Sequence, residues 1–207
     1  MTKKLAGIVI SAAILFIAWY GNYLPLAKSQ AFIDTLRNMS VVRSIDDFKT
    51  MLARPLDMAS PIGQEELVRN SANNVMAILR QTNDPQIISQ LIEYISGYYA
   101  PIVARGRGMS FEQDLYILGT MNEMAFAKTR ELQYLQDAKK YYEQGFALGP
   151  KRPQPLYGLF DVYRTEGNVE ASVKIANQIL SQWPNDAKAL AGLNQFLDYI
   201  ASSTKKK

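Results

Sequence analysis

The chain has 207 residues and lacks both cysteine and histidine. It therefore cannot form disulfides, and it lacks the usual ligands of zinc and haem and the usual general base near neutral pH. We expect no enzyme activity, no cofactor and no metal site.

The net charge of +4 does not describe a basic surface. Five of the 23 basic residues are lysines at the two ends of the chain, at positions 3, 4 and 205–207, so the rest of the chain holds 18 basic residues against 19 acidic ones. Because nucleic acid binds to strongly basic faces, this nearly neutral body excludes it as the expected partner.

The first candidate element is an apolar helix near the N-terminus. Residues 5–27 form an uncharged run of 23 residues. A helix over residues 5–23 is about 28 Å long, which matches a hydrocarbon core about 30 Å thick. Aromatic residues gather at its far end, where they favour the headgroup level: Trp19, Tyr20 and Tyr23. We predict a single membrane anchor over residues 1–27, with residues 5–23 in the lipid bilayer and Pro25 as the stop of the helix.

A cleaved signal peptide is the alternative, and it would make the protein secreted. Such peptides also begin with lysines and an apolar run, and Ser29-Gln30-Ala31 offers small residues for cleavage. The length of the run and its aromatic end favour the uncleaved anchor. Lys3 and Lys4 favour a cytoplasmic N-terminus with the body on the outer side, although basic residues also lie on the other flank: Lys28, Arg37 and Arg43.

Residues 28–109 are predicted to be a helical region that holds degenerate repeats. Apolar residues at spacings of three and four indicate helices over residues 27–39, 44–52 and 63–81. Ser44 is the expected N-cap of the second of these helices. Prolines disfavour helix both at and before their own position, so we expect a break from Arg54-Pro55 to Ser60-Pro61.

The next helix has a strong start signal in Thr82-Asn83-Asp84-Pro85, a capping residue followed by proline at the first helical position. We expect this helix to end near Pro101 or at Gly106-Arg107-Gly108. Ser110 is then the expected cap of a further helix. No alternating strand pattern of useful length occurs, so the sequence predicts an all-α fold.

An internal period appears in the C-terminal half. Pro150 and Pro184 are 34 residues apart, and each closes a helix that presents small and large apolar residues in the same register. A helix with Leu156 and Phe160 and the turn Gly167-Asn168 lie between the two prolines.

This pattern resembles the tetratricopeptide repeat, a helix–turn–helix unit of 34 residues. The run from Ala138 to Pro150 fits the second helix of that repeat nearly position for position. Phe126 and Phe160 depart from the pattern, because the family usually has a small residue there, and residues 132–135 read as an extra-long turn. The resemblance implies an α-solenoid over residues 110–204 with residues 186–201 as a capping helix, followed by a basic tail at 205–207. Its implied repeat core is Ala138, Tyr141, Tyr142, Pro150, Tyr163, Gly167 and Pro184.

The same resemblance implies a function. The inner surface of such a stack is built from the first helices of the repeats, and its expected partner-binding residues are Asn122, Tyr157, Asp161 and Arg164. We therefore expect a non-catalytic, membrane-anchored scaffold that binds a protein or peptide in bacterial envelope assembly.

A looser resemblance covers more of the chain. A membrane helix, the stretch Gln64-Glu65-Glu66, the stretch from Tyr134 to Ala138 and the stretch from Pro150 to Pro153 are similar to the C-terminal region of O-antigen ligase and polymerase-like membrane proteins. This resemblance implies, as the alternative function, an accessory module in surface polysaccharide assembly that carries no catalytic part.

Overall fold

The computed structural model describes residues 2–39 and 43–204, and the predicted basic tail at 205–207 lies outside this part of the chain. Every regular element within the described residues is a helix and none is a strand, so the all-α prediction is confirmed for them. The chain divides into two compact units, Met1–Val75 with Glu93–Ala104 and Met76–Ile92 with Arg105–Lys207. This division differs from the predicted boundary at residues 109/110, because the two helices between residues 64 and 105 each contribute to both units.

The first unit begins with a single continuous helix built from α1 (Thr2–Ala18), the π-helical turn η1 (Trp19–Tyr23) and α2 (Leu24–Arg37). The predicted stop at Pro25 is wrong, and the π turn gives the reason. Leu24 N–H donates to Trp19 O, five residues back, which widens the turn immediately before the proline ring. Pro25 then occupies the first turn of α2, where its missing N–H is tolerated.

This N-terminal helix is long and apolar enough to cross a membrane, and no other helix of the described residues is. Its most apolar window has a mean hydropathy of 1.8, and none of that window is buried. Large apolar side chains project into the surroundings on all sides; Ile8 is 67% exposed and Leu15 is 70% exposed. A signal sequence has the same properties, so length and composition alone do not separate the two predictions.

Helix α3 (Ile45–Leu56) packs against α2. The Ser44 hydroxyl accepts a hydrogen bond from Asp47 N at 3.0 Å, which confirms the predicted N-cap. The expected break is present over residues 57–63, but it begins later than predicted, because Pro55 is buried within the last turn of α3. Pro55 cannot donate to the carbonyl of Met51, and the Thr35 hydroxyl of α2 donates to that carbonyl at 3.2 Å instead. A neighbouring helix therefore satisfies the acceptor that the proline leaves free.

Two longer helices follow, α4 (Gln64–Gln81) and α5 (Pro85–Arg105). Asp84 caps α5 as predicted, since its Oδ1 accepts from Gln86 N at 2.8 Å. Helix α5 continues through Pro101 and ends immediately before Gly106, whose φ of 63° only a residue such as glycine adopts readily. The later of the two expected ends is therefore the observed one.

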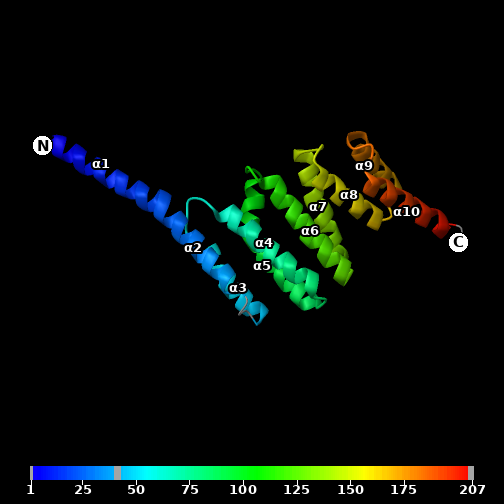
Figure 1. Ribbon diagram of the computed structural model, residues 1–207, viewed down its shortest axis with the longest axis horizontal. Coiled ribbons are helices and arrows are strands. Elements are labelled where there is room, and N and C mark those ends of the chain that lie inside the picture. Colours follow the sequence, from blue (N-terminus) through cyan, green and yellow to red (C-terminus); the bar gives the residue numbers. More distant parts are fainter. Residues whose placement is uncertain (1, 40–42, 205–207) are drawn as a thin grey trace. The chain divides into compact units, whose positions relative to one another are not determined.

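The second unit contains a series of helices that pack in chain order (Figure 1). They are α6 (Phe111–Thr129), α7 (Leu132–Leu148), α8 (Pro153–Thr165), α9 (Val169–Gln182) and α10 (Ala187–Thr204). Each helix packs against the next, and α6 also packs against α8. The extra-long turn predicted over residues 132–135 is wrong, because Arg130 adopts φ 61° and turns the chain within two residues.

The core of these helices is centred on Tyr142, which is 1% exposed. Its ring fills space beside Gly119 of α6 and Gly158 of α8, where an added Cβ would lie 2.5 Å from ring atoms. Ala138 of α7 is also fully buried. The remaining predicted core residues are less buried. Tyr141 and Tyr163 are partly buried, whereas Pro150, Gly167 and Pro184 are exposed and lie in or beside turns.

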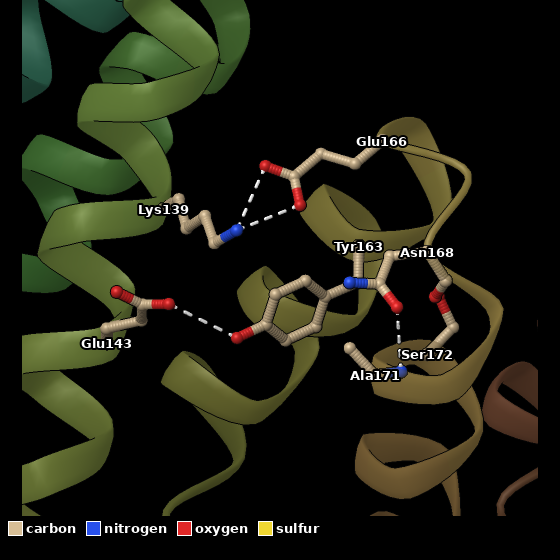
Figure 2. Close-up of polar contacts among 7 residues, drawn as sticks. All are labelled: Lys139, Glu143, Tyr163, Glu166, Asn168, Ala171 and Ser172. Carbon is tan, nitrogen blue, oxygen red and sulfur yellow. Dashed lines mark hydrogen bonds and ion pairs between the residues drawn. The ribbon is translucent and has the colours of Figure 1, made fainter.

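Polar contacts connect α7 to α8 and close the turn after α8 (Figure 2). Lys139 Nζ lies 3.0 Å from Glu166 Oε2, and the Tyr163 hydroxyl donates to Glu143 Oε1 at 3.2 Å. Burial, followed by the negative charge of Glu143, raises the pKa of Tyr163 to about 12. Gly167 turns the chain with φ 71°, and the side chain of Asn168 then caps α9.

Candidate functional site

Three adjoining hollows run along one face of the second unit, and we refer to them together as the inner groove. The first hollow, of about 260 Å³, lies between α8 and α10. The middle hollow, of about 300 Å³, shares Tyr157, Asp161 and Lys188 with the first. The third hollow, of about 330 Å³, shares Tyr116 and Gln154 with the middle one. The shared residues place the three hollows next to one another along this face of the unit.

The lining of the groove comes from alternate helices of the series. Helices α6, α8 and α10 supply nearly all of it, α7 supplies only Tyr142, and α9 supplies nothing. Residues spaced at i, i+4 and i+7 lie on one face of a helix. Each of the three helices directs such a triplet into the groove: Tyr116, Thr120 and Glu123; Tyr157, Asp161 and Arg164; Lys188, Gly192 and Gln195.

Three of the four predicted partner-binding residues line this groove. Tyr157 and Asp161 border both the first and the middle hollow, and Arg164 borders the first. Asn122 does not line it, because its side chain is buried and its amide donates to Leu118 O at 2.8 Å. Asn122 was predicted to lie on the partner-binding surface, but its side chain belongs to the interior of the unit.

The cations of the groove are engaged with other groups of the protein. Arg164 Nη2 donates to Asp161 Oδ1, and Arg164 Nη1 donates to Gly192 O at 3.3 Å. The guanidinium also lies 4.6 Å from the centre of the Phe160 ring. Lys188 lies 5.2 Å from the centre of the Tyr157 ring, an attractive cation–π geometry. These contacts hold Arg164 and Lys188 against the wall of the groove, and Arg152 of the third hollow is paired with Glu112.

Glu123 is the principal acidic group of the middle hollow. Its Oε2 accepts a hydrogen bond from the Tyr142 hydroxyl at 2.8 Å. Burial raises the pKa of Glu123, and the negative charge of Asp161 raises it further; the Tyr142 hydrogen bond, Lys188 and Arg164 lower it in part. Burial, followed by the charge of Glu123, likewise raises the pKa of Tyr142.

The chemistry of this groove suits binding. Within residues 2–39 and 43–204, no group of three or more acidic side chains is arranged to hold a metal ion. The groove offers aromatic faces, carboxylates and cations, which recognise a ligand through stacking, hydrogen bonds and ion pairs.

Sequence analysis missed Glu123 and Lys188, although a signal for Glu123 was present. Tyr116 and Glu123 repeat on α6 the spacing of Tyr157 and Arg164 on α8, which is seven residues. Aligning the first helices of the repeats by this spacing would have predicted the α6 lining. Comparison with known proteins adds no further guidance, since no protein-family model, curated protein or solved structure matches the chain.

Proposed function

We propose that this chain is a membrane-anchored α-solenoid of tetratricopeptide type, whose inner groove binds a partner protein. The observation that supports this proposal is the arrangement of the lining. Helices α6, α8 and α10 present residues at the same i, i+4 and i+7 positions to adjoining hollows of the inner groove. Helical repeat proteins bind partners on extended concave surfaces of this kind, with each repeat adding one strip of side chains.

The packing of α2 supports retention of the anchor over cleavage. The small-residue site Ser29-Gln30-Ala31 lies in the middle of α2, with Ala31 and Phe32 buried. Lys28 is buried as well, and its Nζ donates to Met58 O at 2.7 Å and to Gln64 Oε1. Cleavage at this site would remove Lys28 and leave both acceptors without their donor. The apolar helix and the first helix of the body are one element, which favours a permanent anchor.

Site-specific photocrosslinking in membranes tests the binding proposal. The photoreactive residue p-benzoylphenylalanine is placed at Gln154 or Gln195, both of which are exposed and line the groove. The control is Asn177, which is exposed on α9 and absent from the lining of the groove. We expect the same protein to be crosslinked from both groove positions and not from the control.

Two outcomes would contradict the proposal. A crosslinking pattern that does not distinguish Gln154 and Gln195 from Asn177 would show that the groove is not the binding surface. Recovery of a glycan instead of a protein at the groove positions would favour the accessory role in polysaccharide assembly.

A further inference from the structure

We propose that the middle hollow of the inner groove binds a lysine or arginine side chain of the partner, with Glu123 as its counter-ion. This inference rests on the proposed function, because it names the chemistry that the groove recognises. The hollow, of about 300 Å³, has room for the end of a long side chain. Its occupant is inferred from the charges and rings that line it.

The first argument is the state of the Glu123 carboxylate. Among the described residues, Glu123 forms no ion pair within 4.0 Å, and its one hydrogen bond comes from the neutral Tyr142 hydroxyl. The Glu123 side chain is half-buried, and its pKa is raised by burial. A half-buried carboxylate without an ion-pair partner is less stable than a paired one, and an ammonium or guanidinium group in contact with it would stabilise it.

The second argument is the aromatic lining around that carboxylate. Tyr116 and Tyr157 form walls of this hollow, whereas the Tyr142 ring is buried between Gly119 and Gly158 and contributes its hydroxyl. Tyrosine rings attract cations over their faces and also pack against the methylene stem of a lysine or arginine. Rings and a carboxylate in one hollow therefore match both parts of a long cationic side chain.

The third argument is that Arg164 and Lys188 lower the pKa of Glu123 but form no ion pair with it. Arg164 is paired with Asp161, and Lys188 lies against the Tyr157 ring. Lys188 still borders the middle hollow and lowers the pKa of Glu123 from a distance. Lys188 would repel an incoming cation. We therefore expect removal of Lys188 to strengthen binding of a cationic ligand and to weaken binding of an anionic one.

The test uses the full chain in lipid nanodiscs and fluorescent peptide libraries that differ only in their central residue. That residue is lysine, arginine, glutamate or norleucine, which has a lysine-like stem without the charge. We expect the lysine and arginine libraries to bind about tenfold more tightly than the norleucine library, since one charge-assisted hydrogen bond in a half-buried site accounts for a factor of this size. Fluorescence polarisation measures the dissociation constants.

Three variants decide whether Glu123 is responsible. Glu123→Gln keeps the shape and an acceptor for Tyr142, and we expect it to bring the lysine and norleucine libraries within about twofold. Glu170→Gln is the matched control on the exposed surface of α9, and we expect it to keep the wild-type preference. We expect Lys188→Met, which retains a packing stem over Tyr157, to tighten binding of the lysine and arginine libraries.

Several results would overturn this inference. One is norleucine binding as tightly as lysine, and another is a preference for lysine that persists in Glu123→Gln. Tightest binding of the glutamate library, lost in Lys188→Met, would show an anion site instead, and failure of every library to bind would remove the site altogether. In each case crosslinks at Gln154 and Gln195 still report on the groove as a whole, so the two proposals fail separately.

Discussion

At the scale of single residues, the Tyr142 ring fills a space that exists because each of two neighbouring helices carries a glycine beside it. Gly119 of α6 and Gly158 of α8 flank the ring, and the Tyr142 hydroxyl is held by Thr120 and Glu123. The ring is therefore constrained on both faces and at its tip. Such a site tolerates neither a smaller side chain at Tyr142 nor a larger one at either glycine.

We predict that Gly158→Ala destabilises the protein by about 1–3 kcal/mol, because overpacking a filled core costs that much. The new Cβ would lie 2.5 Å from Tyr142 Cζ, and Gly119 blocks the far side of the ring. The measurement is the free energy of unfolding by urea, followed by circular dichroism. Gly97→Ala is the control, because an added Cβ there meets nothing within 4 Å in α5, and it should stabilise by about 0.5–1 kcal/mol. Equal effects of the two substitutions would refute the packing described for Tyr142.

A second prediction removes the ring itself. We expect Tyr142→Ala to cost about 3–5 kcal/mol, as for other large aromatic residues cut back in a core. Tyr142 is 1% exposed, so the substitution leaves a cavity between α6 and α8. A melting temperature equal to that of the wild type would show that the ring does not hold these helices together.

The charge of Glu123 gives a prediction with a pH dependence. Its pKa in the folded protein is raised above the ordinary value of 4.5, chiefly by burial. The protonated form thus favours folding, and this contribution is fully present below pH 4.5 and is lost as the pH rises through the folded pKa. We expect Glu123→Gln to raise the melting temperature at neutral pH and to lose this advantage in acid. A variant less stable than the wild type at neutral pH would contradict the half-buried, unpaired state of the carboxylate.

Sequence patterns identified several of these residues but not their surroundings. Tyr142 and Ala138 were predicted to be core residues because the repeat places large and small residues at those positions, and both are buried. Gly119 and Gly158 were missed, because a glycine inside a helix signals close approach only once the partner ring is known. Asn122 was misplaced for a similar reason, since a polar side chain that bonds to its own helix is compatible with burial.

At the scale of elements, prolines account for most of the errors. Pro25 and Pro55 were expected to interrupt helices, yet both lie inside continuous helix. Local rules count the hydrogen bond that proline removes, whereas the structure supplies a substitute, a π turn in one case and the Thr35 hydroxyl in the other. The Thr35 hydroxyl lies 16 residues from Met51 in the sequence, outside the local window, so that substitute could not be predicted from the sequence.

The contact between α7 and α8 supplies a test at this scale. We expect Tyr163→Phe to cost about 0.5–1 kcal/mol near neutral pH, because it removes the hydrogen bond to Glu143 while keeping the ring beneath Lys139 (Figure 2). The folded pKa of Tyr163, raised to about 12, lies above the ordinary value of 10.0. This contribution to stability is therefore complete below pH 10.0 and is lost as the pH rises through about 12.

Denaturant unfolding at neutral pH and at pH values above 10.0 measures the difference between the wild type and Tyr163→Phe. The difference should shrink across the alkaline range. A difference that stays constant there would mean that the hydroxyl does not interact with Glu143, and the close contact of α7 with α8 would then rest on apolar packing alone.

At the scale of the whole molecule, composition and periodicity were sufficient for the fold class. Apolar residues at spacings of three and four predicted helices, and the 34-residue separation of Pro150 and Pro184 matches two turns that each follow a helix. The continuity of the N-terminal helix with α2 was not predictable, since Pro25 indicated a stop and is instead preceded by a π turn. Lys28, which was counted among the flanking charges, is buried, and its ammonium donates to Met58 O.

The burial of Lys28 leads to a prediction about the mature protein. We expect the apolar helix to be retained, so that the intact mass of protein purified from membranes includes residues 5–27 and carbonate extraction leaves the chain in the membrane fraction. Truncated chains give a second measurement. A chain that begins at Leu24 keeps the hydrogen bonds from Lys28 to Met58 and Gln64, whereas a chain that begins at Phe32 loses both.

We expect the shorter of these chains to melt at a lower temperature, because hydrogen bonds from a charged group contribute about 1.5–3 kcal/mol and the buried Ala31 is lost as well. Lys28→Met in the longer chain separates the two causes, since it keeps the apolar stem and removes only the donor. A mature, soluble chain that begins at Phe32 and melts at the same temperature as the longer one would refute retention, because cleavage within α2 would then cost the fold nothing.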